Sequence, residues 1–273
     1  MKELSAKQVV IDGAFDDLRA ARVRFIQRAS ELGALNVLLW TDEVVQARTG
    51  KPPKFPYAER RYVLEALRFV SGVTPIKQTD DVAMLDSLSF KPDAWVLSGD
   101  DAPSRAQISE GRQIKSVVMS GDSLYDFSAL PPQQSTGRKK VIVTGCYDWF
   151  HSGHVRFFEE VSALGDLFVV VGHDANIRLL KGEGHPLFPE TERRYLVSCV
   201  RYVTQALVST GHGWVDAEPE ILRVKPDIYA VNEDGDRGGK REYCEKLGIE
   251  YVVLKRKPAP GLPRRSSTDL RGF

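Results

Sequence analysis

The sequence predicts an α/β protein in which one doubly wound parallel sheet is built twice in tandem. The first observation is an internal repeat, because GAFDDLRAARVRFI at residues 13–26 returns in register as GCYDWFHSGHVRFF at residues 145–158. Further along, ERRYVLEALRFV at 59–70 matches ERRYLVSCVRYV at 192–203, and a KPD tripeptide recurs in both halves. An ordered series of matches at nearly constant separation indicates a duplicated unit.

The second observation is that short apolar runs alternate with amphipathic stretches in each half. Strands are predicted at VVI and VIVT, each followed closely by a glycine, and at LNVLLW and LFVVVG further on. The amphipathic stretch between each pair of strands is a predicted helix. These helices should stop at Gly33 and Gly165, because glycine is common just past a helix end.

The third observation is helical spacing in the two ERRY segments, which places apolar residues on one stripe that a sheet can bury. The stripes contain Val63, Ala66, Leu67 and Val70 in the first half and Leu196, Cys199, Val200 and Val203 in the second. Later strands are predicted at AWVL, IYAV, KSVVM and EYVVL. Repeated strand–helix–strand units imply right-handed parallel crossovers, and hence an open Rossmann-like sheet in each half.

These elements divide the chain into two domains and a linker. Residues 1–120 form the first predicted domain and residues 141–273 the second. The segment GDSLYDFSALPPQQSTGRKK at 121–140 has the Pro, Gln, Ser and Gly content of a surface connection. A length of 273 residues suits either one large domain or two smaller ones.

Composition favours a globular cytoplasmic protein. The chain is 42% hydrophobic and 27% charged, and its net charge of +1 argues against a general binder of nucleic acid. It contains no apolar run of the ~20 residues that a membrane span needs, and its start lacks the apolar core of a signal peptide. Its three cysteines form no CxxC pair, which favours reduced thiols over a disulfide framework.

All five histidines lie in the second half, and two of them follow its first predicted strand. Ligands of open parallel sheets bind at the carboxyl ends of the strands. A helix that begins near His151 and His154 would present free N–H groups to a phosphate at that edge. Gly145 and Gly153 would let the backbone approach the ligand closely. We therefore expect a phosphate-binding loop at this strand end.

His151 and His154 are three residues apart, so their imidazoles should project to the same side of a first helical turn. Both can donate hydrogen bonds to phosphate oxygens as charge develops during a displacement. The alternatives are two ordinary structural histidines or two zinc ligands. No third zinc ligand has a recognisable spacing and no HExxH occurs, so no protein-bound metal is predicted.

GCYDWFHSGH resembles the G-x-F-D-x-x-H-x-G-H signature of cytidylyltransferases and related nucleotidyltransferases. The similarity continues through LLKGEG, ETERRYLVSCVRYV and the terminal RSSTDL, so it covers nearly all of the second half and, more weakly, the first. The tandem arrangement is most similar to the ethanolamine-phosphate cytidylyltransferase family. The resemblance implies the HxGH nucleotidyltransferase fold. It also implies transfer of a cytidylyl group from CTP to a phosphorylated alcohol, with release of pyrophosphate and with Mg²⁺ present.

The resemblance assigns roles to individual residues. His151 and His154 would hold the triphosphate and stabilise the transition state at the α-phosphate. Lys181 would reach the phosphates as a mobile point charge, although spacing alone equally allows a solvated loop lysine. Arg193 would clamp phosphate. The implied nucleotide-binding residues are Gly145, Cys146, Tyr147, Asp148, Gly153, Ser266, Ser267 and Thr268. Asp148 would fix the loop, bind through a solvent-mediated contact or cap the following helix.

The basic tail KRKPAPGLPRRSSTDLRGF contains RSSTDL, which resembles the R-T-x-G-x-S-T-[ST] element of the family. Its hydroxyl residues would start a helix whose N-terminus faces phosphate. The pattern departs from the family just upstream, because Gly261 stands where the family has an arginine. Arg264 and Arg265 are both candidates to replace that arginine, and the alternative reading of the whole tail is a flexible charged terminus.

Two positions concern the acceptor substrate by resemblance. Asp174 matches an acidic position near the head group of the accepting alcohol, and Trp214 matches an aromatic residue that can face a cationic amine. Each has a structural alternative, a helix cap for Asp174 and a packing residue for Trp214. The run VNEDGD at 231–236 departs from the Gly-Asp-Asp-like run of the family, which leaves the alcohol and the base open.

The first half lacks the HxGH residues, because Arg19, Ala20, Ala21 and Arg22 stand in their place. We therefore expect a degenerate first domain and an active second domain, which pack as a pseudo-dimer or assemble into a homodimer. The leading prediction is a cytidylyltransferase that acts on a phosphoethanolamine-like acceptor. The alternatives are an adenylyltransferase that uses ATP and a sugar phosphate or a flavin, and a nucleotide sensor without catalysis.

Overall fold

The computed structural model of the protein describes residues 7–99, 102–267 and 270. The chain divides into two compact units, Met1–Asp126 and Phe127–Phe273. The division falls inside the segment 121–140 that the sequence predicts as a linker. Part of that segment belongs to the second unit, because the Gln133 backbone N–H donates to the Thr204 carbonyl at 2.8 Å and the Thr136 hydroxyl donates to Asp166 at 2.6 Å.

Each unit contains one five-stranded sheet in which every strand pairing is parallel. The strands of the first unit are β1 (Gln8–Gly13), β2 (Ala34–Trp40), β3 (Gly72–Ile76), β4 (Ala94–Leu97) and β5 (Lys115–Val118), in the order β3-β2-β1-β4-β5. Those of the second are β6 (Lys140–Gly145), β7 (Asp166–Val171), β8 (Val203–Val208), β9 (Ile228–Asn232) and β10 (Glu250–Leu254), in the order β8-β7-β6-β9-β10. The two orders are equivalent, which confirms the predicted pair of doubly wound sheets.

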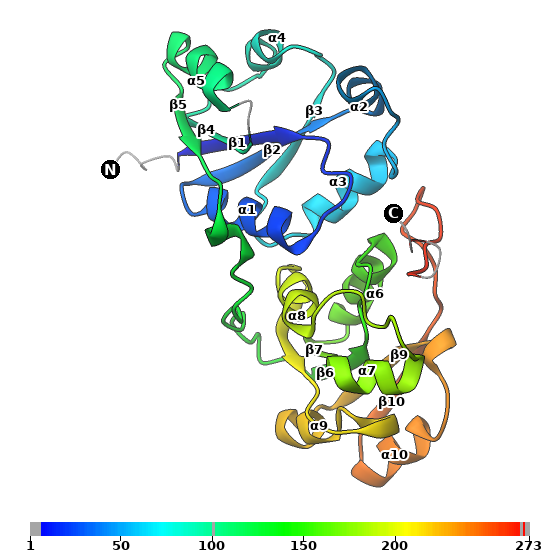
Figure 1. Ribbon diagram of the computed structural model, residues 1–273. Helices are drawn as coiled ribbons and strands as arrows, with labels where there is room; N and C mark the ends of the chain where they lie inside the picture. Colours follow the sequence, from blue (N-terminus) through cyan, green and yellow to red (C-terminus); the bar gives the residue numbers. More distant parts are fainter. Residues whose placement is uncertain (1–6, 100–101, 268–269, 271–273) are drawn as a thin grey trace. The chain divides into compact units, whose positions relative to one another are not determined.

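Helices connect the strands of both sheets (Figure 1). In the first unit they are α1 (Ala20–Ser30), α2 (Asp42–Thr49), α3 (Tyr57–Glu65), α4 (Asp81–Asp86), α5 (Ala102–Gly111) and the 3₁₀ turn η1 (Asp122–Tyr125). In the second they are α6 (Ser152–Ser162), α7 (Asp174–Lys181), α8 (Glu190–Ser198), α9 (Glu218–Val224) and α10 (Lys240–Leu247), with 3₁₀ turns η2 (Gly213–Val215) and η3 (Glu233–Gly235).

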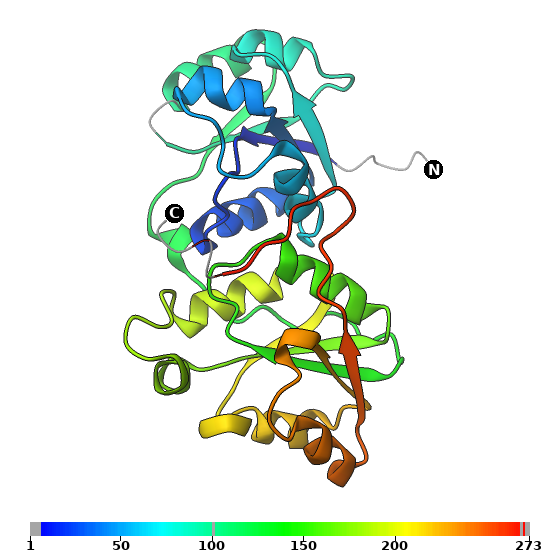
Figure 2. The same ribbon diagram turned by 90° about the vertical axis from the view of Figure 1, so that its right-hand side faces the viewer.

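The second unit has three layers, with α6 and α8 on one face of the sheet and α9 and α10 on the other (Figures 1 and 2). On the first face, Phe158 of α6 and Val197 of α8 pack against strand residues such as Val143. On the second face, Ile221 of α9 and Cys244 of α10 pack against residues of β6, β7 and β9. The apolar side chains of the sheet are therefore covered from both sides, as alternating strands and helices require.

The turn between the first helix and the second strand of each unit requires glycine. A Cβ on Gly165 would come within 2.0 Å of the Lys139 carbonyl oxygen, and one on Gly33 within 2.3 Å of the Lys7 carbonyl oxygen. The glycines predicted to end these helices are thus needed for close backbone approach. The equivalent turn recurs at the equivalent place in both units, as expected for a duplication.

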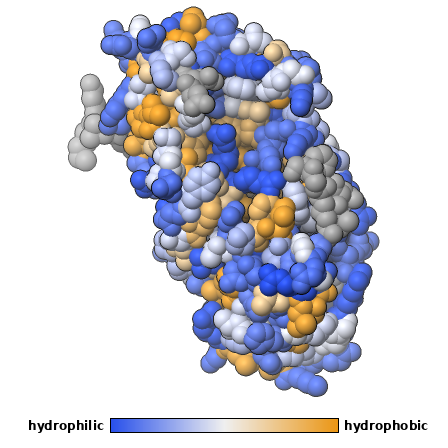
Figure 3. Space-filling view, viewed as in Figure 1, coloured by the Kyte–Doolittle hydropathy of each residue, from blue (hydrophilic) through white to orange (hydrophobic). Residues whose placement is uncertain are grey.

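The face of the molecule in Figure 3 carries mostly hydrophilic side chains, with apolar patches between them. Among the helices of the described residues, none is long and apolar enough to cross a membrane.

Candidate functional site

The loop between β6 and α6 brings His151 and His154 together. His151 is the N-cap of α6, and its Nδ1 accepts a hydrogen bond from the Gly153 backbone N–H at 3.0 Å. The two imidazole rings are stacked, with centroids 4.0 Å apart, so both project to one side as the sequence predicts. The ring of Tyr147 contacts His154 edge-on at a centroid distance of 5.4 Å. The pair is therefore held in place by packing and by the helix cap.

The two glycines of this loop make room for its own aromatic side chains. A Cβ on Gly145 would lie 2.8 Å from Cζ of Tyr147, and one on Gly153 would lie 2.8 Å from Cε1 of His151. The sequence predicts that these glycines lie close to a ligand, and each of them lines a cavity of the second unit. Each also leaves room for an aromatic ring, Tyr147 at Gly145 and His151 at Gly153. Tyr147 itself adopts a left-handed backbone conformation with φ of 55°, which bends the loop sharply after β6.

His151 and His154 line a cavity of about 160 Å³ at the carboxyl ends of β6 and β9. Two cationic side chains, Lys240 and Arg256, line the same cavity, together with Asn232. Nδ1 of His154 and Oδ1 of Asn232 are buried and have no hydrogen-bond partner among the described residues. The two cations at this strand edge favour an anion in the cavity, and the unpartnered ring nitrogen of His154 could donate to it. The Asn232 oxygen can only accept a hydrogen bond.

Burial lowers the pKa of His154 well below its usual 6.5, and the nearby charges of His151, Arg256 and Lys181 act in the same direction. His154 is thus neutral near pH 7 and offers one N–H donor. A bound polyphosphate would oppose this shift, because negative charge favours the imidazolium form.

Acid should therefore destabilise the fold through His154. Below about pH 6.5 the unfolded chain binds a proton at this histidine and the folded protein does not, so the free energy of unfolding falls as the pH falls. Between pH 7.5 and pH 5.5 we expect the wild type to lose on the order of 1 kcal/mol more than His154→Gln. Urea denaturation of both proteins at both pH values measures the difference. Equal losses would contradict this role for burial.

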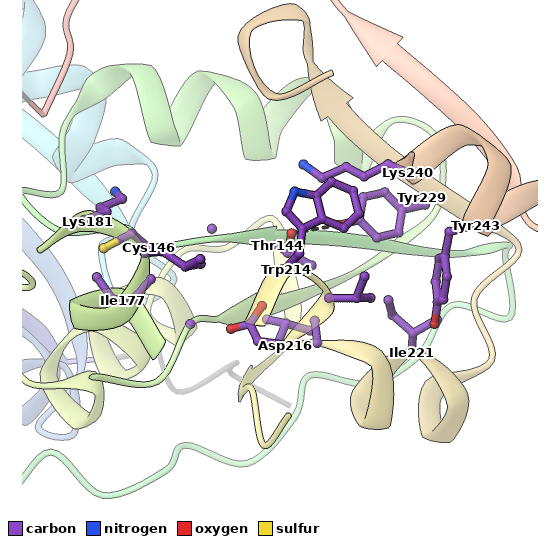
Figure 4. Close-up of a pocket in the computed structure, with 16 residues that line it drawn as sticks. Thr144, Cys146, Ile177, Lys181, Trp214, Asp216, Ile221, Tyr229, Lys240 and Tyr243 are labelled. Atoms are coloured by element: carbon purple, nitrogen blue, oxygen red, sulfur yellow. Dashed lines mark hydrogen bonds between the residues drawn. The ribbon is translucent and has the colours of Figure 1, made fainter. Parts of the chain in front are cut away.

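A second cavity of about 260 Å³ lies beside the first, and Thr144 and Lys240 line both cavities. Figure 4 shows Lys240 alongside Trp214 and Tyr229 at one end, with Lys181 and Cys146 at the other. The predicted phosphate residue Lys181 thus lies in the second cavity, at the end of α7 and before Gly182.

The sequence expectation that Arg193 clamps phosphate is wrong for this structure. Arg193 is fully buried, and its guanidinium donates to the carbonyl oxygens of Phe188, Cys146 and Gly172 and to Oδ1 of Asp174. The N–H groups with which Arg193 would hold an anion donate instead to these protein acceptors. Arg193 therefore ties the β6–α6 loop, the end of β7 and the start of α8 together.

The first unit repeats this arginine network although it lacks the histidines. Arg60 is 2% exposed and donates to the carbonyl oxygens of Phe55, Ala14 and Trp40 and to Oδ1 of Asp42. Each acceptor occupies the position equivalent to an acceptor of Arg193. Because the network is present without the HxGH residues, it supports the fold of the loops.

Two predicted carboxylates have structural contacts as well. Asp148 is buried and accepts hydrogen bonds from the backbone N–H groups of Leu187 and Phe188 at 2.9 and 3.1 Å. It therefore fixes a loop and does not cap α6, whose N-cap is His151. Asp174 is the first residue of α7 and the partner of Arg193, whereas the N-cap of that helix is His173. The cap expected at Asp174 lies one residue earlier.

The described part of the basic tail returns to the β6–α6 loop. The Ser267 hydroxyl donates to the Asp148 carbonyl at 2.9 Å, and the Arg265 carbonyl accepts from Arg256 at 3.1 Å. Of the three hydroxyl residues predicted here, Ser266 and Ser267 are non-helical, and Thr268 lies outside the described residues.

Arg256 is the tail cation that lines the histidine cavity. Arg264 and Arg265 line a small neighbouring cleft that also includes Arg256. The family pattern points to Arg264 and Arg265 and gives no indication of Arg256. The signal for Arg256 is its position two residues after β10, at the carboxyl edge of the sheet.

Trp214 is 47% exposed and lines the second cavity from η2. Its ring packs against Gly238, where a Cβ would come within 2.7 Å of Cζ2. The Lys240 ammonium lies 5.9 Å from the ring centroid, within the range of a cation–π contact. The cation near this ring is thus a side chain of the protein, Lys240, which no motif of the sequence marks as a site residue.

In the first unit a buried ion-pair cluster occupies the place that Thr144 and Tyr229, two polar residues of the second cavity, occupy in the second unit. Asp12 and Trp95 are the counterparts of Thr144 and Tyr229, and the Trp95 indole donates to Asp12 at 2.9 Å. Arg105 pairs with Asp12 at 3.1 Å and with Asp81 at 2.9 Å. The side chain of Asp12 is only 2% exposed.

Fold and site together define a class of protein. A doubly wound sheet carries a histidine pair at a helix N-terminus, and cationic side chains surround two joined cavities at the carboxyl edge. These features are those of an α/β protein that binds a nucleotide or another phosphate-bearing ligand at this edge.

Comparison with known proteins identifies the family. Residues 142–272 match the Cytidylyltransferase-like family. A protein named FAD synthase from Ferroglobus placidus is 37% identical over 120 residues, which are 43% of this chain and 75% of that protein. The chain belongs to the cytidylyltransferase-like family of nucleotidyltransferases, and this confirms the resemblance and the enzyme class predicted from GCYDWFHSGH.

Other proteins are similar to a little under half of the chain. The FAD synthase of Archaeoglobus profundus is 34% identical over 48% of this chain and 83% of that protein. The Bifunctional protein HldE of Citrifermentans bemidjiense is 42% identical over 46% of this chain and 26% of that protein. The crystal structure of the lipopolysaccharide core biosynthesis protein from Thermoplasma volcanium GSS1 is 29% identical, with a TM-score of 0.39 over 44% of this chain and 99% of that one.

Proposed function

We propose that the second unit transfers a nucleoside monophosphate from a nucleoside triphosphate to a phosphorylated small molecule and releases pyrophosphate. The observation that carries the proposal is the stacked pair of His151 and His154 in a cavity that also holds Lys240 and Arg256. The helix N-terminus and the cations favour a polyphosphate in this cavity. The neighbouring cavity then receives the acceptor.

The reaction requires positioning and charge neutralisation by the protein. An oxygen of the acceptor phosphate forms a bond to the α-phosphorus, and the bond from that phosphorus to the oxygen bridging to the β-phosphate breaks. The His154 and His151 imidazoles would donate hydrogen bonds to α-phosphate oxygens as charge builds up there. Arg256 would neutralise charge on the pyrophosphate that leaves.

The family and its relatives support different donors. The description of the family favours CTP, as the resemblance of the sequence does. Relatives whose name is FAD synthase favour ATP, because FAD contains an adenylyl group. We keep CTP with a phosphorylated alcohol and ATP with a sugar phosphate or a flavin as the two candidate reactions. In either case we propose a cytoplasmic enzyme.

Mg²⁺ would accompany the triphosphate. Among the residues that the structure describes, no group of three or more His, Cys, Asp and Glu side chains is placed to hold a metal ion. Asp234, which lines the histidine cavity, is paired with Arg256. A nucleotide-borne Mg²⁺ is held mainly by phosphate oxygens and water, and it lowers the negative charge of the triphosphate.

Pyrophosphate release tests the proposal directly. The protein is incubated with Mg²⁺, with CTP or ATP, and with phosphoethanolamine, phosphocholine, glycerol 3-phosphate, a sugar phosphate or FMN. We expect release of pyrophosphate that depends on both substrates with one nucleotide and one acceptor class. Tight nucleotide binding with no release from any pair would instead favour the alternative of a nucleotide sensor.

We further propose that the first unit is an inactive copy. Arg19, in the place of His151, pairs with Asp17 at 2.9 Å, and the Arg22 guanidinium packs over the Phe15 and Phe25 rings. The buried Asp12–Arg105 pair stands where the second unit has its polar cavity residues. A unit with these contacts retains the fold and lacks the groups that the reaction needs.

A further inference from the structure

Lys240 occupies the boundary between the two cavities of the second unit. It lines both of them, and Thr144, at the end of β6, is the other residue that they share. Its ammonium donates to the Gly235 carbonyl at 2.8 Å, which fixes the end of the side chain beside η3. A cation at this boundary lies where the acceptor must meet the nucleotide in the proposed reaction.

The walls of the second cavity combine apolar and aromatic surface with a net positive charge. Trp214, Tyr229, Tyr243, Ile177, Leu180 and Ile221 contribute apolar surface. The charged residues that line this cavity are two lysines, Lys181 and Lys240, and one carboxylate, Asp216. The Asp216 carboxylate accepts a hydrogen bond from the Ser209 hydroxyl at 2.6 Å. Figure 4 shows the two lysines at opposite ends of the cavity, with Trp214 beside Lys240.

A positively charged acceptor head group fits this cavity poorly. The Trp214 ring already has Gly238 against it and the Lys240 ammonium 5.9 Å from its centroid. A substrate amine near the ring would be brought close to a like charge, which is unfavourable in a half-buried site. Burial also lowers the pKa of Lys240, and an incoming phosphate would favour its charged form.

We propose that Lys240 is a specificity-determining residue that holds the phosphate of the acceptor at the boundary between the cavities, with an uncharged apolar or aromatic body of the acceptor against Trp214 and Leu180. This inference rests on the proposed nucleotidyl transfer and narrows its acceptor class. Phosphomonoesters with an ammonium group, such as phosphoethanolamine, are then disfavoured.

Calorimetric titration of the full chain with two probes tests the inference. Phenyl phosphate carries the dianion on an aromatic body, and phosphoethanolamine carries it beside an ammonium group. We expect phenyl phosphate to bind about tenfold or more tightly than phosphoethanolamine. Lys240→Gln should weaken phenyl phosphate about tenfold or more, because a hydrogen bond between charged groups is lost. Lys240→Arg should retain most of the binding, because it keeps the charge.

The matched control is Lys246→Gln, since Lys246 is an exposed lysine on the same helix, α10. It should bind phenyl phosphate as the wild type does. The inference would be overturned if phosphoethanolamine bound as tightly as phenyl phosphate or more tightly. It would also be overturned if Lys240→Gln left the binding of phenyl phosphate unchanged. Lys240-dependent binding of phenyl phosphate in a protein that releases no pyrophosphate with any substrate pair would support this inference and reject the proposed transfer.

Discussion

Substitution of His154 by alanine is expected to lower the rate of pyrophosphate release about 10²- to 10³-fold, because a positioned donor to the developing charge is removed. Its Nδ1 has no hydrogen-bond partner among the described residues, so the substitution removes no protein contact of that atom. The loss should appear in kcat more than in KM if the hydrogen bond forms mainly in the transition state. Steady-state kinetics with the nucleotide and acceptor identified by the screen measure both constants.

His151 needs a more careful substitution because it also caps α6. His151→Asn keeps a residue that caps helices well and removes the imidazole, so its effect on rate is separated from an effect on folding. Arg19→Ala and Arg22→Ala are the matched controls at the equivalent positions of the first unit, and both should retain most of the activity. Full activity after loss of both histidines would exclude the proposed site.

Substitution of Arg193 by leucine is expected to reduce the stability of the second unit by about 3–5 kcal/mol, because several buried acceptors lose their donor at once. The Asp174 carboxylate and three carbonyl oxygens would be left without it. That loss is a large part of the free energy of unfolding of a typical domain. Arg193→Lys should recover little of it, since an ammonium cannot reproduce the forked geometry of the guanidinium.

Urea denaturation of each variant measures the effect of Arg193, and Arg60→Leu is its matched control. Because Arg60 makes the equivalent contacts, its loss should destabilise the first unit to a similar extent. If Arg193 bound phosphate directly, Arg193→Lys would lose activity while its unfolding midpoint stayed at the wild-type value. That result would contradict the scaffold role derived from the structure.

Much of the fold could be predicted from the sequence because duplication makes patterns visible twice. Two parallel sheets are predicted by the period of the apolar runs and by the repeated ERRY segments. Gly33 and Gly165 stand at equivalent turns and add to this prediction. The histidine pair was also predictable, since a short stretch of chain determines both its spacing and its place at a helix start. Its role in catalysis stays a prediction.

The rest of the site depends on contacts that local sequence does not encode. Arg193 stands in a family position that suggests a phosphate role, but most of its acceptors lie 19 to 47 residues away in sequence. Lys240 and Arg256 carry no local motif, and they reach the cavities because the ends of β9 and β10 meet at one edge of the sheet. Which side chains meet at this edge depends on the order of the strands in the sheet. The sequence alone does not predict which individual residues are brought together there.

The ion-pair cluster of the first unit limits what simple reversion could achieve. Installing histidines at positions 19 and 22 would restore the imidazoles on a loop whose arginine support is still in place. It would leave the Asp12 carboxylate, which accepts from both Trp95 and Arg105, at the counterpart of Thr144. The Asp12–Arg105 ion pair would still fill the place where the second unit has its polar cavity residues. The two histidines alone would therefore not reverse the inactivity that we propose for the first unit, because the carboxylate and its arginine partner would also have to change.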